Sequence, residues 1–249
     1  MINWKKLGVQ IISTLLFCFG LLVLFLLNPS LLYAKKTKFK NITLFHNQPL
    51  DKGFSELLKE SLKALEKAKI ADKDLKSEVC LDDGSAYPQL VKSVLGDDLM
   101  RAFSNKVVIH GKVDVPNNQL KAWDRQLKFT QFLSHALVHN LQYKKHGFWD
   151  ANPLGGYPEW KWEGYVEYEV LGKDRDLKTL FNLLETAPND PYHWIDLGNN
   201  EQTIRLHVEY LVLSKYCFEV LNWDYTNFMK DKTTKAVLYK QLAQWYQTQ

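Results

Sequence analysis

The chain has 249 residues, of which 46% are hydrophobic, 13% aromatic and 24% charged, a composition that excludes a disordered polypeptide and suits one domain with a small appendage. Its three cysteines include no CxxC spacing, which excludes a disulfide scaffold and a cysteine-rich zinc module. Six lysines and no acid lie in residues 1–40, which leaves 26 basic against 28 acidic residues elsewhere, so no nucleic-acid partner is expected.

An uncharged and strongly apolar segment runs from residue 7 to residue 34. Its centre, Leu15–Leu27, reads LLFCFGLLVLFLL, and about 20 apolar residues are enough to span a bilayer. We therefore expect residues 1–34 to be a single-pass anchor that contacts the membrane through residues 7–34. The alternative is a cleaved secretory signal, although Leu32-Tyr33-Ala34 matches the small-residue cleavage pattern poorly.

Two signals bear on the orientation of this segment, and they oppose each other. Two lysines precede the apolar segment and four follow it, and the positive-inside rule then favours a cytoplasmic domain. The signal-like layout of the N-terminus favours the other side of the membrane. We expect a single-pass membrane protein with an extracytoplasmic domain.

After the anchor, the chain first alternates strands with helices. Apolar and partly β-branched runs predict strands at residues 39–45, 79–81 and 106–110. Helical spacing of apolar residues predicts helices at residues 54–70 and 87–95. The resulting order, β-α-β-α-β, indicates a small mixed sheet.

The second half is predicted to be helical, so residues 35–249 together form one α+β domain. One apolar stripe predicts a long helix from Asn118 to Lys145, and Gly147 ends it. A loop is expected at residues 152–156. The shorter helices that follow are predicted at residues 158–171, 177–186, 201–221 and 234–247.

Two histidines four residues apart, His135 and His139, lie inside the predicted long helix. Residues at this spacing lie on one side of a helix, with Cβ atoms about 5–6 Å apart, so both imidazoles can bind one Zn²⁺. The pair alone also fits another interpretation, in which one histidine is on the surface and the other is satisfied in the core.

A carboxylate 24 positions after His139 strengthens the metal interpretation. Glu163 lies in the segment Pro158–Tyr168, PEWKWEGYVEY, on the next predicted helix. Two imidazoles and one carboxylate form a His₂Glu ligand set, which leaves the fourth zinc position open for water.

With both motifs in place, the sequence resembles the gluzincin metallopeptidases, in particular their peptidase-MA-like branch. The pattern of that family is a helix with HExxH, followed by a helix that reads roughly P-x-W-x-x-E-G-x-A-x-Y. The segments Ser134–Gln142 and Tyr157–Tyr168 are similar to it. The resemblance implies a zincin-like fold behind the membrane helix, a zinc ion, and a peptide or protein ligand.

The resemblance also implies roles for individual residues. His135, His139 and Glu163 correspond to the metal ligands of the family. Trp160 and Gly164 correspond to packing residues that set the second helix against the first.

One departure from the family pattern affects the chemistry. The second position of HExxH is the general base that takes a proton from the zinc-bound water, and here it is Ala136, whose methyl group accepts no proton. Positioned acid–base groups contribute about 10²–10⁴-fold to the rate, so we expect weak or no protease activity. Two alternatives remain: an active hydrolase with a substitute base, of which Glu167 and Glu159 are the nearest acids, or a membrane-anchored interaction module without metal.

Other residues have open roles at this stage. His207 and Tyr210 lie on the late helix, where related enzymes place an oxyanion-stabilising group, but a core or surface role is the default for both. Cys80 and Cys217 are equally compatible with a disulfide and with two free thiols. Six aromatic residues fit a binding groove and, more commonly, core packing: Trp149, Tyr157, Trp160, Trp162, Tyr165 and Tyr168.

Overall fold

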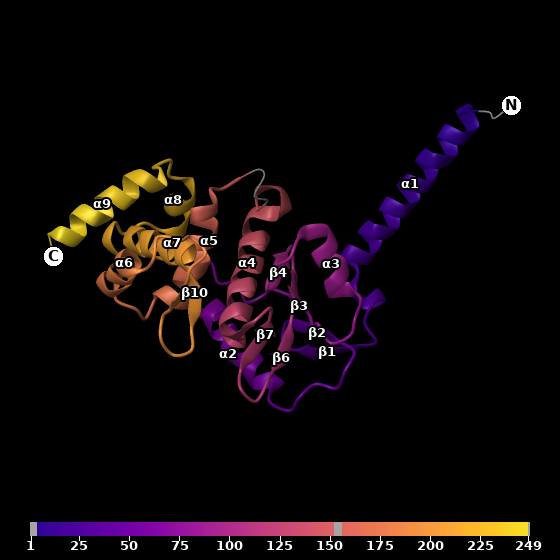
Figure 1. Ribbon diagram of the computed structural model, residues 1–249, viewed down its shortest axis with the longest axis horizontal. Helices are drawn as coiled ribbons and strands as arrows, with labels where there is room; N and C mark the ends of the chain where they lie inside the picture. Colours follow the sequence, from indigo (N-terminus) through magenta and orange to yellow (C-terminus); the bar gives the residue numbers. More distant parts are fainter. Residues whose placement is uncertain (1–3, 152–155, 249) are drawn as a thin grey trace.

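The N-terminal helix α1, Trp4–Leu27, projects away from the rest of the molecule (Figure 1). The computed structural model describes residues 4–151 and 156–248, so most of the loop predicted at residues 152–156 lies outside the described residues. Within α1, the window Gln10–Leu27 is long and apolar enough to cross a membrane, and none of it is buried. A signal sequence near the N-terminus can also be long and apolar enough to meet this criterion. The short helix η1, Pro29–Leu31, follows α1.

A five-stranded mixed sheet forms the first half of the domain, with the strand order β1-β2-β3-β5-β4. Strands β2, β3 and β5 are parallel, while β1 and β4 are antiparallel strands at the two edges. Helices α2 and α3 connect the parallel strands. The bounds are β1 (Lys35–Phe39), β2 (Ile42–His46), α2 (Phe54–Lys67), β3 (Ser77–Cys80), α3 (Tyr87–Leu95), β4 (Met100–Phe103) and β5 (Lys106–Ile109).

The predicted β-α-β-α-β order is thus confirmed, and the two edge strands were missed. Strand β1 reads KKTKF, and four of its five residues are exposed, so it has no apolar run that indicates a strand. Residue Lys40, with a φ of 49°, turns the chain from β1 into β2, which divides the strand predicted at residues 39–45.

The predicted long helix was wrong over its first part, because residues 112–128 form a three-stranded antiparallel sheet. Its strands are β6 (Lys112–Asp114), β7 (Gln119–Ala122) and β8 (Arg125–Lys128). Leu120 and Leu127 pair across β7 and β8, and both are buried. Two leucines seven residues apart fit a helical stripe as well as a hairpin. The positive φ of Trp123, 53°, belongs to the hairpin turn.

Helix α4, Phe129–Asp150, carries the two histidines, and its helical geometry breaks at Gly147, where φ is 78°. The predicted helix at residues 201–221 begins only at Arg205, because Gln202–Ile204 pairs with Trp194–Asp196 as a two-stranded sheet. The remaining elements are α5 (Glu159–Glu167), a π-helical turn (Tyr168–Gly172), α6 (Leu177–Thr186), β9 (Trp194–Asp196), β10 (Gln202–Ile204), α7 (Arg205–Lys215), a second π-helical turn (Tyr216–Val220), α8 (Tyr225–Lys230) and α9 (Lys235–Gln247).

Helix α4 lies between the sheet and the C-terminal helices (Figure 1), and α5 packs closely on α7. A Cβ added at Gly164 would overlap Ser214 Oγ and lie 2.7 Å from the carbonyl O of Tyr210. The ring of Trp160 packs edge-on against Phe228 of α8, with 5.6 Å between ring centroids. Both residues therefore pack α5 against the C-terminal helices, and the expectation that they pack it against α4 was wrong.

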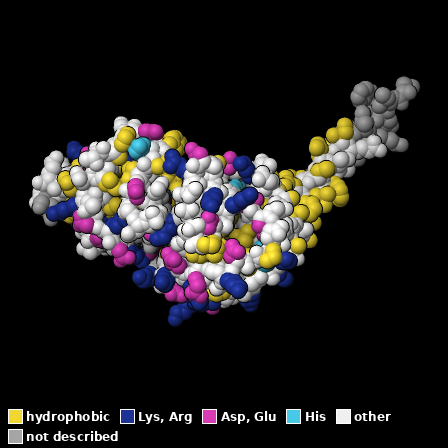
Figure 2. All heavy atoms as spheres, turned by 60° about the horizontal axis from the view of Figure 1, so that its bottom comes forward, with side chains coloured by type: hydrophobic (Ala, Val, Ile, Leu, Met, Phe, Trp, Pro, Cys, Tyr) yellow, Lys and Arg dark blue, Asp and Glu magenta, His cyan; other side chains and the backbone are white. Residues whose placement is uncertain are grey.

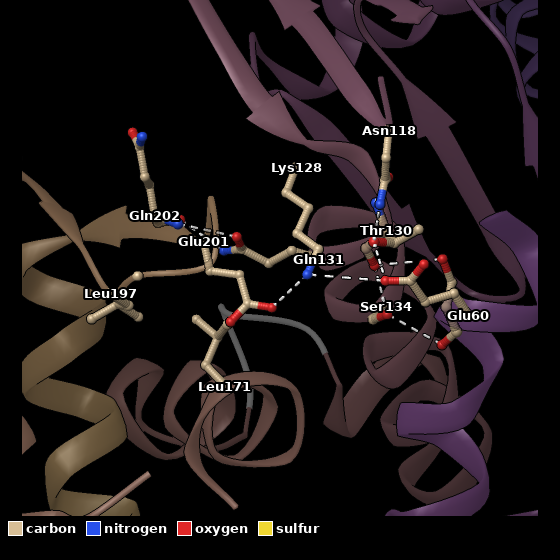
Figure 3. A network of polar contacts seen from close by, with 12 residues as sticks. Glu60, Asn118, Lys128, Thr130, Gln131, Ser134, Leu171, Leu197, Glu201 and Gln202 are labelled. Atoms are coloured by element: carbon tan, nitrogen blue, oxygen red, sulfur yellow. Dashed lines mark hydrogen bonds and ion pairs between the residues drawn. The ribbon is translucent and has the colours of Figure 1, made fainter. Parts of the chain in front are cut away.

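A network of polar contacts joins the two halves near the start of α4 (Figure 3). The side chain of Gln131 donates to the carbonyl O of Gln202 at 2.7 Å and accepts from its N–H at 3.1 Å. Lys128 Nζ donates to Glu201 Oε1 at 2.9 Å. Because β10 leads directly into α7, these contacts fix α7 relative to α4.

Candidate metal centre

Three side chains converge between α4 and α5. His135 Nε2 lies 3.1 Å from His139 Nε2 and 3.3 Å from Glu163 Oε2. The third edge of this triangle, from His139 Nε2 to Glu163 Oε2, measures 3.2 Å. The structure thus brings together the three residues that the sequence indicates as metal ligands.

The local structure explains why these atoms meet. His135 and His139 are one helical turn apart on α4, so their rings lie side by side with centroids 4.8 Å apart. Glu163 reaches them from the middle of α5. The His135 and Glu163 side chains are 22% and 20% exposed, so both are partly accessible to solvent.

Each histidine is held by a second residue through its other ring nitrogen. Glu167 Oε1 lies 3.4 Å from His135 Nδ1, and Gln142 Oε1 lies 2.9 Å from His139 Nδ1. Since these oxygens act as acceptors, both Nδ1 atoms carry a proton and donate it. Both Nε2 atoms then face Glu163 Oε2; without a metal a protonated Nε2 donates to that carboxylate, and a bound metal would take the place of this proton.

The charges around this cluster reinforce each other. Burial by itself lowers the pKa of His135, but the hydrogen bonds that it donates to Glu163 and Glu167 outweigh this effect and raise that pKa to about 10. Burial raises the pKa of Glu167, but the hydrogen bonds from His135 and His207 dominate and lower it to about 2. The pKa of Glu163 is likewise held well below its ordinary value, against the effect of burial, by His139 and His135. The cluster therefore favours a cation among its ligand atoms.

The three ligand atoms fit a zinc ion. A tetrahedral Zn²⁺ with ligands at about 2.0–2.1 Å separates neighbouring ligand atoms by about 3.3–3.4 Å. The observed separations of 3.1–3.3 Å are only slightly shorter. Two imidazoles and one carboxylate also match the N and O donors that zinc prefers, with one coordination position left for solvent.

Ala136, which stands where the HExxH pattern has its general base, is buried. Ala136 is 2% exposed and belongs to the main hydrophobic core. The two acids considered as substitutes lie in different surroundings. Glu159 is exposed at the start of α5, whereas Glu167 is 2% exposed and lies against His135 Nδ1. This place favours an orienting role for Glu167 over the role of a substitute base.

His207 of α7 contacts the cluster through His135 and Glu167. Its ring stacks on that of His135, with centroids 6.0 Å apart and planes at 4°, and its Nδ1 donates to Glu167 Oε1 at 2.7 Å. The ring of Tyr210 in turn stacks on that of His207, with ring centroids 6.1 Å apart. Both residues therefore lie within the site region, although neither provides one of the three ligand atoms.

The aromatic residues divide into two groups. Trp160, Tyr165 and Tyr168 are buried in the core. Trp162 is half-buried and stacks on His139, with ring centroids 5.9 Å apart, and Tyr157 stacks on its indole in turn. Side-chain placement at Trp149 lies outside the described part of the chain. Cys80 and Cys217 are separate, buried free thiols.

Sequence reasoning missed two supporting residues. Gln142 holds His139 and also donates from Nε2 to the carbonyl O of Trp162 at 3.1 Å, which ties α4 to α5. Thr203 of β10 donates to Glu167 Oε1 at 3.4 Å. The spacing of Gln142, three residues after His139, was a usable signal; nothing in the sequence near Thr203 indicated its role.

Among residues 4–151 and 156–248, His135, His139 and Glu163 are the one group of three or more metal-binding side chains with ligand atoms close enough to share an ion. No family model, curated protein or solved structure matches this chain.

Proposed function

We propose that this protein is a membrane-anchored, zinc-binding relative of the gluzincin metallopeptidases that binds a peptide or protein ligand and has weak or no protease activity. The observation that supports it most strongly is the ligand triangle, in which both Nε2 atoms lie within 3.3 Å of Glu163 Oε2 while Glu167 and Gln142 hold the opposite nitrogens. Histidines that bind a metal almost always donate their other ring N–H to such a second partner.

In this proposal the residues of the site have separate roles. His135, His139 and Glu163 hold the metal, and Glu167 and Gln142 fix the orientation of the imidazoles. A bound zinc ion supplies a Lewis acid that polarises a carbonyl group and acidifies a coordinated water. Ala136, the residue directly after His135 on α4, ends in a methyl group and accepts no proton. The site therefore binds an acyl group better than it cleaves one.

The metal content of the purified full-length protein tests this function. In detergent, the wild type should hold about one zinc per chain, measured by inductively coupled plasma mass spectrometry. His139→Ala should abolish stoichiometric zinc, because a site with three protein ligands does not retain the ion on two.

His193→Ala is the matched control, since His193 is an exposed histidine and should retain full zinc content. Circular dichroism of each variant shows whether the fold is intact. A metal-free wild type whose folding is unchanged by His139→Ala contradicts the proposal and leaves the interaction module as the better interpretation.

Zinc affinity should depend on pH because zinc competes with a proton on His135. The pKa of this imidazole is raised from 6.5 to about 10 in the metal-free protein. That proton stabilises the metal-free fold fully below pH 6.5, and the stabilisation is lost as the pH rises through 10. Between about pH 6 and pH 8 we expect the affinity to rise about tenfold per pH unit, measured by competition with a chelator. A pH-independent affinity would contradict this assignment.

A further inference from the structure

The C-terminal end of α1 and the residues just after it form hydrogen bonds with the domain. Tyr87 Oη donates to the carbonyl O of Leu26 at 2.7 Å, and Tyr33 Oη donates to the carbonyl O of Leu81 at 2.7 Å. Cleavage after Ala34 would remove one partner of each hydrogen bond. A removable signal has no need of such contacts with the mature domain.

The same end of the helix covers a second hydrophobic core on the outer side of the sheet. Leu26 and Leu32 pack against this cluster, and Tyr33 belongs to it. The buried members of the cluster are Tyr33, Phe45, Cys80, Tyr87, Val91 and Val108. Without residues 26–33 this apolar surface would be exposed to water, so the segment completes the fold.

These contacts also fix where α3 lies relative to a bilayer. Leu26 is inside the apolar window Gln10–Leu27, and Tyr87, which bonds to it, is the first residue of α3. Helix α3 packs against α1 at the end where α1 meets the domain (Figure 1). If α1 spans the membrane, α3 therefore begins at the depth where the hydrocarbon core ends.

Apolar side chains are exposed on this part of the surface. Val94 and Leu95, at the end of α3, are 42% and 40% exposed, and Leu31 just after α1 is 54% exposed. Trp123 is 60% exposed and lies near Asp97, two residues beyond α3. In Figure 2 the hydrophobic side chains of α1 continue to the place where the helix meets the domain. Among the described residues outside α1, the large exposed apolar side chains are these four, Tyr192 and Val237.

The lysines directly after α1 complement a membrane surface, while the acidic Asp97 and Asp98 beyond α3 are paired with Lys92 and Arg101. Lys35, Lys36 and Lys38 are exposed on β1, directly after the apolar segment, and the first acidic residue of the chain is Asp51. Juxtamembrane lysines are attracted to anionic headgroups, and tryptophan is enriched at the level of those headgroups. The lysines, Trp123 and the apolar end of α3 are together suited to lipid.

We propose that the domain lies on the bilayer that α1 spans, with Leu31, Val94, Leu95 and Trp123 in the lipid interface and α1 retained as part of the fold. This inference rests on the membrane-anchored part of the proposed function and is independent of zinc.

Spin-label accessibility in vesicles of phosphatidylcholine and phosphatidylglycerol tests this docking. Native Cys18 is exposed in α1, while Cys80 and Cys217 are buried and do not react. Val94→Cys and its matched control Val237→Cys, both in a Cys18→Ser background, place labels on two valines that are 42% and 48% exposed. Leu95→Cys is a second docking probe, in case Val94→Cys does not fold.

The measured quantity is the collision rate with oxygen divided by that with a water-soluble nickel complex. We expect this ratio to be severalfold higher at position 94 than at position 237, and to approach the value at Cys18. A high ratio at Cys18 with equal, low ratios at positions 94 and 237 overturns the docking and leaves the span intact. A low ratio at Cys18 overturns both the docking of the domain and the membrane span of α1. Mass spectrometry that finds a mature chain beginning near Lys35 also overturns the proposal.

Discussion

Ala136→Glu should create or raise hydrolysis of an unstructured protein substrate by about 10²-fold or more. The substitution places a carboxylate one position after His135, where the gluzincin pattern holds its general base. If His135, His139 and Glu163 hold zinc as proposed, a proton acceptor is the component of the gluzincin pattern that this site lacks. The measurement is the initial rate of cleavage of fluorescently labelled casein by the zinc-loaded full-length protein.

Ala136→Gln is the matched control, because the amide has nearly the same shape but does not accept the proton. The difference between the two variants isolates the base from any change in packing. Since Ala136 is buried in the main core, the unfolding free energy and zinc content of both variants must be measured alongside. A folded, zinc-loaded Ala136→Glu protein that is as inactive as Ala136→Gln would show that the site has diverged beyond the loss of one residue.

Wild-type activity provides a separate check on Glu167. We expect cleavage by the wild type to be near background. Substantial wild-type cleavage that Glu167→Gln abolishes while zinc stays bound would identify a substitute base. The contact of Glu167 with His135 Nδ1 instead predicts that this variant weakens zinc binding, since such second partners are worth about 10–100-fold in metal affinity.

The fold was predictable where hydrophobic spacing had one interpretation. The parallel strands and their connecting helices have short β-branched runs and amphipathic stripes, and the sequence order identified them. Strand β1 was missed because its residues are mostly lysine and exposed, and it is held by backbone pairing with β2. Leu120 and Leu127 suited a helix and a hairpin equally, and the choice depends on burial against α4, which is a tertiary contact.

The candidate site was predictable to the extent that it is local. His135 and His139 share a helix, and the family pattern supplies Glu163 from the next one. The contact between His207 and Glu167 joins residues 40 positions apart, and it exists only because α7 packs on α5. Long-range contacts of this kind leave no periodic signal in one sequence. The sequence therefore indicated the three residues of the cluster, and most of the contacts around them were not predictable.

Gly164→Ala should destabilise the fold by about 3 kcal/mol, an effect at the upper end of those caused by overpacking. The new methyl group would overlap Ser214 Oγ and lie 2.7 Å from the carbonyl O of Tyr210. The backbone of α7 cannot move away without disturbing its own helical hydrogen bonds. The gain of about 1 kcal/mol in helix propensity on replacing glycine by alanine offsets only part of this cost. Urea unfolding of the detergent-solubilised protein, followed by tryptophan fluorescence, measures the difference.

Gly172→Ala is the matched control for this prediction. A Cβ there would meet Leu211 Cδ1 at 2.6 Å, but that atom is the end of a flexible side chain and can shift, so the cost should be about 1 kcal/mol or less. Gly164 directly follows Glu163, the proposed metal ligand, and lies three residues before Glu167 on α5. Displacing α5 from α7 therefore moves a metal ligand, and Gly164→Ala should lower zinc affinity as well as stability, whereas Gly172→Ala should leave zinc affinity unchanged. Equal unfolding free energies for the two variants would mean that α5 and α7 are not packed as closely as the glycine contact indicates.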